Sequence, residues 1–195
     1  MFKIIKKEPL NPSMTRMVIE APFVARKAMP GQFIILRVNE TGERIPLTIA
    51  DYDREAGTVT IIYQKVGKST LLLDEQEAGG YLMDFIGPLG KASELEGYKK
   101  AAVIGGGAGC AIAYPQAKAL HAMGTKVDMI AGFRDKDLII LENEMREASD
   151  RLIVMTDDGS NGNKGFVTAA LQKNIDEGAD YDLVIAIGPI PMMKA

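Results

Sequence analysis

A cluster of glycines interrupts an apolar segment in the second half of the chain. Residues 101–104 are apolar, Gly105–Gly107 and Gly109 follow, and residues 110–115 resume as the start of a helix. A buried parallel strand that ends in glycines and continues as a helix presents backbone N–H groups at the helix N-terminus, where they can bind a pyrophosphate. The segment departs from the dinucleotide-binding fingerprint, which requires glycine at Cys110. A turn that serves only tight packing therefore stays an alternative.

Two more loops follow predicted strands of the same half. Thr156–Gly165 is a polar loop, and Gly188–Met193 combines glycine with two prolines. The first is as typical of a flexible turn-rich segment as of a ligand site, and the second is also typical of a helix N-terminus. Because the carboxyl ends of parallel strands meet at one edge of a sheet, we expect both loops to lie beside the glycine cluster, where α/β sheets bind ligands.

A second pattern lies in the first half of the chain. Gly67, Lys68 and Ser69 suggest a phosphate loop, but that motif requires an earlier glycine where Ile62 stands. What remains is a glycine followed by hydroxyl side chains at the start of a predicted helix, which is typical of an N-cap that binds an anion or is purely structural. Thr48, on a predicted strand, is either a hydroxyl for a flavin ring nitrogen or an ordinary strand threonine.

Composition excludes several classes of function. The chain has 195 residues, 47% of them hydrophobic and 25% charged, and its net charge of −3 gives no basic field to attract nucleic acid or an anionic membrane. No apolar stretch approaches the roughly 20 residues of a membrane span, and the N-terminus has no signal-peptide core. One cysteine and one histidine exclude an internal disulfide, an all-cysteine metal or iron–sulfur site and a multi-histidine metal site within this sequence. We expect a cytoplasmic protein.

The first half of the sequence reads as a β domain. Residues 1–97 contain short β-rich runs between turn signals and one helix candidate, Ser69–Glu77, which predicts a small antiparallel barrel of the six-stranded type. The predicted strands are Thr15–Glu20, Phe33–Val38, Leu47–Ala50, Thr58–Tyr63 and Tyr81–Phe85.

The second half, residues 98–195, alternates strand and helix, which predicts right-handed βαβ units, a parallel sheet and an α/β domain. We place the domain boundary at residue 97, near the turns at Gly87–Gly90 and Glu96-Gly97. The sequence stops where a further helix begins, so we expect this sheet to be incomplete on its C-terminal side. The expected strands are 101–105, 126–131, 152–156 and 182–187, and the expected helices are 109–123, 137–147 and 165–173.

The order of these motifs resembles the ferredoxin–NADP reductase superfamily, over essentially the whole chain. Within it, the chain is most similar to electron-transfer subunits that pair with a larger enzyme. These are the small subunit of NADH-dependent reduced ferredoxin:NADP oxidoreductase, also described as a sulfide dehydrogenase subunit, and the related dihydroorotate dehydrogenase electron-transfer subunit. The resemblance is carried by Arg44–Asp51, Val66–Thr70, Gly87–Gly90, Gly105–Gly109, Gly132–Leu138, Thr156–Gly159 and Ala186–Ala195.

The resemblance implies FAD on the barrel and a nicotinamide dinucleotide, NAD(H) or NADP(H), on the second domain. Thr48 would lie near flavin N5, with Pro46 and Leu47 against the ring. No acid–base residue and no metal ligand is implied, because positioning alone supports hydride transfer. The implied FAD residues are Arg44, Pro46, Leu47, Thr48, Ile62, Tyr63, Gln64 and Val66 and, at the pyrophosphate, Gly67, Ser69 and Thr70. The implied NAD(P) residues are Gly106, Gly107, Ala108, Gly109, Arg134, Asp157, Asp158, Gly188, Pro189 and Met192.

Three features depart from the family pattern. The family's arginine precedes the strand hydroxyl by three residues, whereas Arg44 precedes Thr48 by four, which on a strand changes the face unless a bulge intervenes. Ile187 replaces a cysteine that many relatives carry close to the nicotinamide. The closing strand and the cysteine-rich segment that holds a [2Fe–2S] cluster in these subunits are absent from the sequence, so the family implies a cluster for which this chain has no ligands.

The sequence therefore predicts a flavoprotein oxidoreductase subunit that transfers a hydride between NAD(P)H and FAD and passes electrons to a larger flavin or iron–sulfur subunit. A dihydroorotate dehydrogenase electron-transfer subunit and a non-catalytic docking fragment of such a complex stay open as alternatives, and so does a cluster-free flavin reductase that acts alone. The family favours NAD over NADP, whereas Arg134 would favour a 2′-phosphate.

Overall fold

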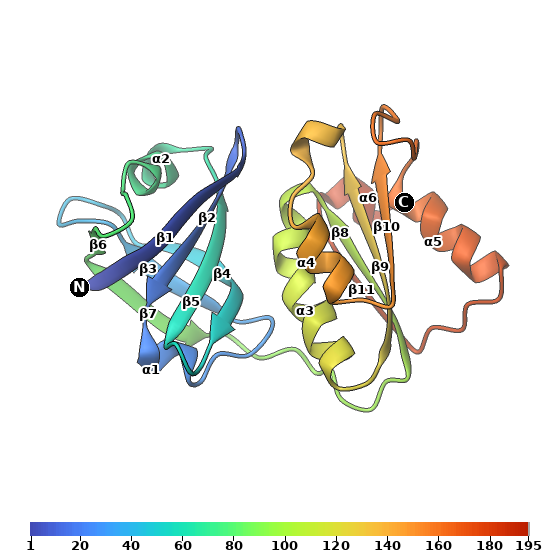
Figure 1. The fold of residues 1–195 in the computed structure, drawn as a ribbon, viewed down its shortest axis with the longest axis horizontal. Helices are drawn as coiled ribbons and strands as arrows, with labels where there is room; N and C mark the ends of the chain where they lie inside the picture. The colour runs from blue at the N-terminus through green and yellow to red at the C-terminus, as the bar shows by residue number, and fades with distance from the viewer. Residues whose placement is uncertain (195) are drawn as a thin grey trace. The chain divides into compact units, whose positions relative to one another are not determined.

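A computed structural model describes residues 1–194, and the chain divides into two compact units (Figure 1). The first unit is Met1–Ser93, and the second begins at Glu94. Within the described residues, no helix has the length and apolar character needed to cross a membrane.

The first unit is the predicted antiparallel barrel. Its strands follow the order β6-β1-β2-β5-β4-β3-β7, and every pairing is antiparallel. Two short helices, α1 (Pro22–Ala25) and α2 (Lys68–Asp74), connect them. Strands run over β1 (Phe2–Asn11), β2 (Met14–Glu20), β3 (Phe33–Arg37), β4 (Ile45–Asp53), β5 (Thr58–Gln64), β6 (Tyr81–Leu82) and β7 (Asp84–Leu89).

The sheet has seven strands where the sequence suggested the six-stranded type. The named predictions did not include β1, and the predicted strand Tyr81–Phe85 is divided at Met83 into β6 and the start of β7. β6 pairs with β1 at one edge of the sheet, while β7 pairs with β3 at the other. The Met83 N–H lies between them and donates to the carbonyl oxygens of Arg37 and Val38, at 3.0 and 3.2 Å. The two edge strands are thus consecutive in the chain, which nearly closes the barrel.

The barrel core follows from the period-two alternation of the strands. In β5, Val59, Ile61 and Tyr63 are buried, while the residues between them are only partly covered. The predicted helix Ser69–Glu77 is the shorter α2, and Gly79 (φ of 91°) turns the chain toward β6. The Gly87-Pro88-Leu89 segment, which the sequence placed near the domain boundary, belongs to β7 and pairs with β3.

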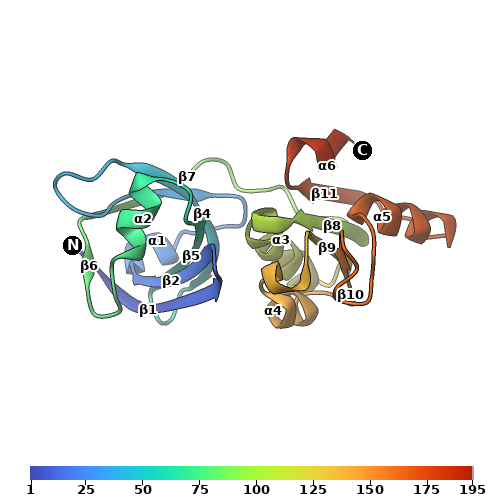
Figure 2. The same ribbon diagram turned by 90° about the horizontal axis from the view of Figure 1, so that it is seen from above.

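The second unit contains the predicted parallel sheet, in the order β10-β9-β8-β11. In Figure 2, α3 and α4 lie on one face of this sheet and α5 on the other. The strands are β8 (Lys100–Gly106), β9 (Lys126–Phe133), β10 (Arg151–Thr156) and β11 (Leu183–Ile187). The helical segments are η1 (Gly107–Gly109), α3 (Cys110–Ala122), η2 (Lys136–Leu138), α4 (Glu142–Glu147), α5 (Val167–Asp176) and α6 (Ile190–Lys194).

One predicted helix of this unit is interrupted. The segment 137–147 consists of the short turn η2 and the separate helix α4. Between them, Ile140 and Leu141 are buried, and Leu141 adopts a left-handed backbone with φ of 56°. Burial of these two side chains turns the chain toward the core and breaks the helix.

Candidate cofactor sites

The open part of the glycine cluster is a tight turn between β8 and α3. β8 ends at Gly106, and Gly107 takes a left-handed backbone with φ of 54°. Among the described residues, no heavy atom beyond its chain neighbours lies within 4 Å of the position of a β-carbon at Gly107. No described side chain caps the N-terminus of η1 or of α3. Uncapped N–H groups beside open space at a helix N-terminus have the donor chemistry that a pyrophosphate requires.

Other glycines of the cluster serve packing. A β-carbon at Gly109 would overlap the carbonyl oxygen of Ile187 in β11, and one at Gly105 would come within 2.7 Å of the Cys110 sulfur. Cys110 is fully buried, and burial raises the pKa of its thiol to about 12, so the thiol stays protonated. The cluster therefore combines an open turn with close contacts between strand and helix, at different glycines.

The loop after β10 is held by its own hydrogen bonds. The Thr156 hydroxyl is buried and donates to Asn161 Oδ1 at 2.8 Å, and Asn161 Nδ2 donates to the Val154 carbonyl at 2.9 Å. Ser160 Oγ accepts from the Lys136 N–H at 2.8 Å, which ties the loop to the segment after β9. These hydrogen bonds hold the loop in one conformation, which argues against the flexible, turn-rich segment that its composition also allowed.

Arg134, Asp157 and Asp158 come together where β9 and β10 end. The Asp157 N–H donates to the Phe133 carbonyl at 3.0 Å, and the Asp158 N–H donates to the Arg134 carbonyl at 3.3 Å. Hydrogen bonds from the side chain and backbone of Ser160 lower the pKa of the Asp158 carboxyl, so this exposed group is ionised at neutral pH. Two carboxylates and one guanidinium thus lie on neighbouring loops.

The three predicted loops of this unit meet at one edge of the sheet. The last residues of β8, β9 and β10 are in register, with Gly106 opposite Gly132 and Phe133 opposite Thr156. On the other side of β8, Ile187 of β11 lies opposite Gly105, which brings the turn at Gly188-Pro189 next to the glycine cluster. The carboxyl edge of the sheet thereby gathers all of the residues that the family resemblance assigned to NAD(P).

Arg44, Pro46 and Thr48 share the outer face of the barrel. β4 pairs with β3 without a bulge from Ile45 to Thr48, and Ile45 and Leu47 pack against the core, so the residues that alternate with them point outward. The spacing of four therefore keeps Arg44 on the side of Thr48. Its guanidinium forms an ion pair with Asp84 of β7 at 3.0 Å. The Asp84 carboxylate also forms an ion pair with Arg37.

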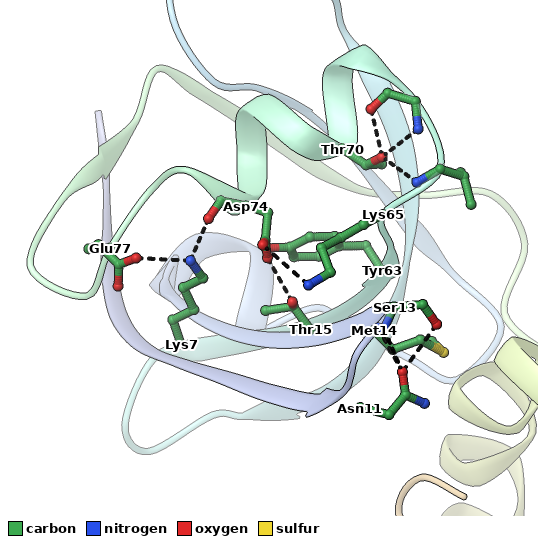
Figure 3. A network of polar contacts seen from close by, with 12 residues as sticks. Lys7, Asn11, Ser13, Met14, Thr15, Tyr63, Lys65, Thr70, Asp74 and Glu77 are labelled. Carbon is green, nitrogen blue, oxygen red and sulfur yellow. Dashed lines mark hydrogen bonds and ion pairs between the residues drawn. The ribbon is translucent and has the colours of Figure 1, made fainter. Parts of the chain in front are cut away.

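The turn before α2 presents Gly67 and fixes Thr70. A side chain at Gly67 would meet no described atom within 4 Å. The Thr70 hydroxyl accepts from the N–H groups of Val66 and Gly67, at 3.1 and 3.2 Å, and donates to the Gly67 carbonyl, as Figure 3 shows. The Ser69 hydroxyl donates to Glu43 at 2.9 Å. The Thr70 side chain therefore holds the turn itself.

Tyr63 lies on the inner face of β5, opposite to Ile62 and Gln64. Its side chain is buried, and its hydroxyl donates to Asp74 Oδ1 at 3.0 Å. Burial and the Asp74 carboxylate raise the pKa of Tyr63. Only the backbone of Tyr63 is therefore left to contact a ligand on the outer face of the strand.

Sequence reasoning missed Asp74, which is the centre of a polar network at one end of the barrel (Figure 3). Its carboxylate also accepts from the Thr15 hydroxyl at 2.7 Å and pairs with Lys65 at 3.5 Å, while Lys7 donates to the Asp74 carbonyl oxygen. A carboxylate in the last turn of a helix opposes the helix dipole. This unfavourable placement, after three leucines, was the signal that could have identified it.

Comparison with known proteins places the chain in a family. Residues 103–195 match the oxidoreductase NAD-binding domain. The chain is 43% identical to a dihydroorotate dehydrogenase B (NAD(+)) electron transfer subunit homolog of Thermotoga maritima, over 98% of this chain and 67% of that protein. It is 32% identical to the dihydroorotate dehydrogenase B (NAD(+)) electron transfer subunit of Geobacillus sp., over 98% of this chain and 75% of that protein.

Comparison of the fold with solved structures leads to the same family. A solved structure of an NADH-dependent reduced ferredoxin–NADP oxidoreductase, from a study of flavin-based electron bifurcation, matches all of this chain and 70% of its own with a TM-score of 0.92 and 41% identity. The predicted two-part fold and the predicted resemblance are both confirmed. The chain belongs to the family of ferredoxin–NADP reductase-like electron-transfer subunits that includes the dihydroorotate dehydrogenase B subunits.

Proposed function

We propose that this chain is the electron-transfer subunit of a heteromeric flavoenzyme, in which it moves a hydride between NAD(P)H and FAD and passes electrons to a larger subunit. The observation that carries this proposal is the uncapped turn at Gly107, which borders open space within an oxidoreductase NAD-binding domain. Family membership supports FAD on the barrel and the heteromeric assembly, because relatives are electron transfer subunits of dihydroorotate dehydrogenase B. A cytoplasmic location is part of the proposal.

In this reaction the protein contributes by orienting the two cofactors. When bound, the two cofactors supply the hydride donor and acceptor, so the chain needs no acid–base side chain. We assign the N–H groups of the turn at Gly107–Gly109 to the dinucleotide pyrophosphate and the Thr48 hydroxyl to flavin N5. The Gly67 turn, with its open backbone, is assigned to the FAD pyrophosphate. To reach the FAD pyrophosphate, the Arg44 guanidinium would have to leave its ion pair with Asp84 or share it.

The proposal is tested by reconstitution with FAD. Purified protein incubated with FAD and desalted should keep a yellow flavin spectrum that NADH or NADPH bleaches under anaerobic conditions. Protein that stays colourless and oxidises neither nucleotide would refute the assignment. Turnover with ferricyanide separates the enzyme from a docking fragment, since only the enzyme reduces this artificial acceptor. Turnover that depends on added free flavin would instead identify a reductase that acts alone.

We further propose that the site prefers NAD(H) over NADP(H), because the carboxylates of Asp157 and Asp158 would repel a 2′-phosphate more than Arg134 attracts it. At this exposed edge, where solvent screens the charges, we expect about a fivefold lower Kd for NADH than for NADPH. Titration of both nucleotides by fluorescence measures this ratio. The double variant Asp157→Asn, Asp158→Asn should reduce the preference, and Arg134→Ala should increase it. A wild-type preference for NADPH would contradict this assignment.

A further inference from the structure

The Asp74 carboxylate joins the chain before the Gly67 turn to the chain after it. Before the turn, the Tyr63 hydroxyl donates to Asp74 Oδ1 at 3.0 Å, and the Lys65 ammonium pairs with Asp74 Oδ2 at 3.5 Å. After the turn, Asp74 is itself the last residue of α2. Because Tyr63 and Asp74 are 11 residues apart, one carboxylate closes this part of the chain into a loop.

The closed end of this loop is anchored in the barrel, as Figure 3 shows. Thr15 of β2, the strand partner of Tyr63, donates to the same carboxylate oxygen at 2.7 Å, and Lys7 of β1 donates to the Asp74 carbonyl oxygen. The side chains of Thr15 and Tyr63 are buried, and so is that of Leu73, which lies in the barrel core. The C-terminal end of α2 is therefore tied to β1, β2 and β5, which pair with one another in one sheet.

The turn at the other end of the loop has little packing of its own. Residues 66–68 are exposed, and a β-carbon at Gly67 would meet no described atom within 4 Å. The hydrogen bonds of the Thr70 hydroxyl stay within the turn, so they fix its shape without attaching it to the barrel. The bond from Ser69 to Glu43 is exposed to water, which makes it a weak attachment. The place of the turn therefore depends on the buried network at the far end of α2.

We propose that Asp74 is a positioning residue for FAD: its carboxylate, held by Tyr63 and Thr15, fixes the end of α2 and thereby the place of the Gly67 turn. This inference rests on the proposed function, which assigns that turn to the FAD pyrophosphate. Donors that are already in place bind an anion more tightly, since ordering a mobile segment on binding costs affinity. A carboxylate that opposes the dipole of its own helix thus serves to order the turn at the other end of that helix.

The first test is amide hydrogen exchange and needs no cofactor. The N–H groups of Val66, Gly67 and Leu71 are hydrogen-bonded within the turn, so their exchange reports its opening. In Tyr63→Phe, which removes the closing hydroxyl, these amides should exchange about threefold to tenfold faster. Ile19→Val is the matched control: Ile19 is fully buried toward the other end of β2, and losing one buried methyl group costs about as much stability as losing one hydrogen bond. Unchanged exchange in Tyr63→Phe would overturn the inference and leave the proposed function intact.

The second test compares two flavins by fluorescence titration, at a temperature where circular dichroism shows each variant to be folded. Tyr63→Phe should raise the Kd of FAD about threefold to tenfold and Asp74→Ala should raise it further, with Asp74→Asn in between because it keeps an acceptor. The Kd of riboflavin, which lacks the pyrophosphate, should stay unchanged, and Ile19→Val should change neither value.

Tyr63→Phe is the deciding variant, since it removes a single hydroxyl and does not depend on the folding of Asp74→Ala. An unchanged Kd of FAD in Tyr63→Phe, or equal increases for FAD and riboflavin, would overturn the positioning role. A wild-type protein that binds no FAD would count against the proposed function instead.

Discussion

Substitution of Gly109 by alanine is expected to destabilise the second unit by about 3 kcal/mol and to raise the Kd of the dinucleotide more than tenfold. The added β-carbon would overlap the Ile187 carbonyl oxygen and lie 2.8 Å from its carbonyl carbon. These are backbone atoms of β11, which the pairing with β8 holds in place, so they cannot move aside cheaply. The strand end would have to separate from the turn that carries the N–H groups.

For Gly109→Ala, packing and helix propensity predict changes in stability of opposite sign, so the direction of the measured change decides between them. Gly109 has helical backbone angles, φ of −61° and ψ of −23°, and in such a position helix propensity alone favours alanine by about 1 kcal/mol. Urea unfolding and nucleotide titration measure the two quantities. Gly67→Ala is the matched control: its β-carbon meets no described atom within 4 Å and its φ is −156°, so its stability should stay near that of the wild type. A Gly109→Ala protein as stable as the wild type would contradict the packing role.

Loss of the Asp74 carboxylate is expected to have the next largest effect. Asp74→Ala leaves the hydroxyls of Thr15 and Tyr63 without their acceptor, and both residues are at most 2% exposed. Lys65 loses its ion pair as well. Because each buried group without a partner costs about 1–3 kcal/mol, we expect a loss of about 3 kcal/mol in the free energy of unfolding.

Graded variants separate the parts of this network. Asp74→Asn keeps an oxygen that accepts from both hydroxyls, so its loss should be smaller than that of Asp74→Ala. Tyr63→Phe removes one donor and should cost about 1 kcal/mol. Glu77→Ala is the surface control: its carboxylate pairs with Lys7 but is 78% exposed, so it should cost less than about 1 kcal/mol. Equal losses for Asp74→Ala and Glu77→Ala would contradict the central place of Asp74.

The same carboxylate predicts a pH dependence. Burial alone would raise the pKa of Asp74, but the hydrogen bonds from Thr15 and Tyr63 and the charges of Lys7 and Lys65 lower it below its usual value. A carboxyl whose pKa is lower in the folded than in the unfolded state stabilises the fold above its unfolded pKa of about 3.9, and this contribution is lost as the pH falls through the folded value. Urea unfolding of wild type and Asp74→Asn between neutral and acidic pH should therefore converge at low pH.

Local sequence patterns predicted the four strands of the second unit and their order along the chain. Apolar runs such as 101–104 form buried parallel strands because each is short, uninterrupted and followed by glycine or polar loop residues. The register of β8 with its neighbours then brings the three predicted loops to one edge without further information. The family motifs in their order predicted the class of protein, since the comparison places the chain in that family.

Contacts between residues far apart in the chain were decided only by the tertiary structure. A predicted strand is divided at Met83 because the residues before Met83 pair with β1 and the residues after it pair with β3. Thr15 and Asp74, 59 residues apart, meet inside the barrel, and no local pattern encodes that meeting. Periodicity reports which face of an element is buried, but it does not report which side chain fills the space above a glycine. The family resemblance assigned Gly106, Gly188 and Met192 to one site, and only the packed structure showed that the Met192 side chain lies against both glycines.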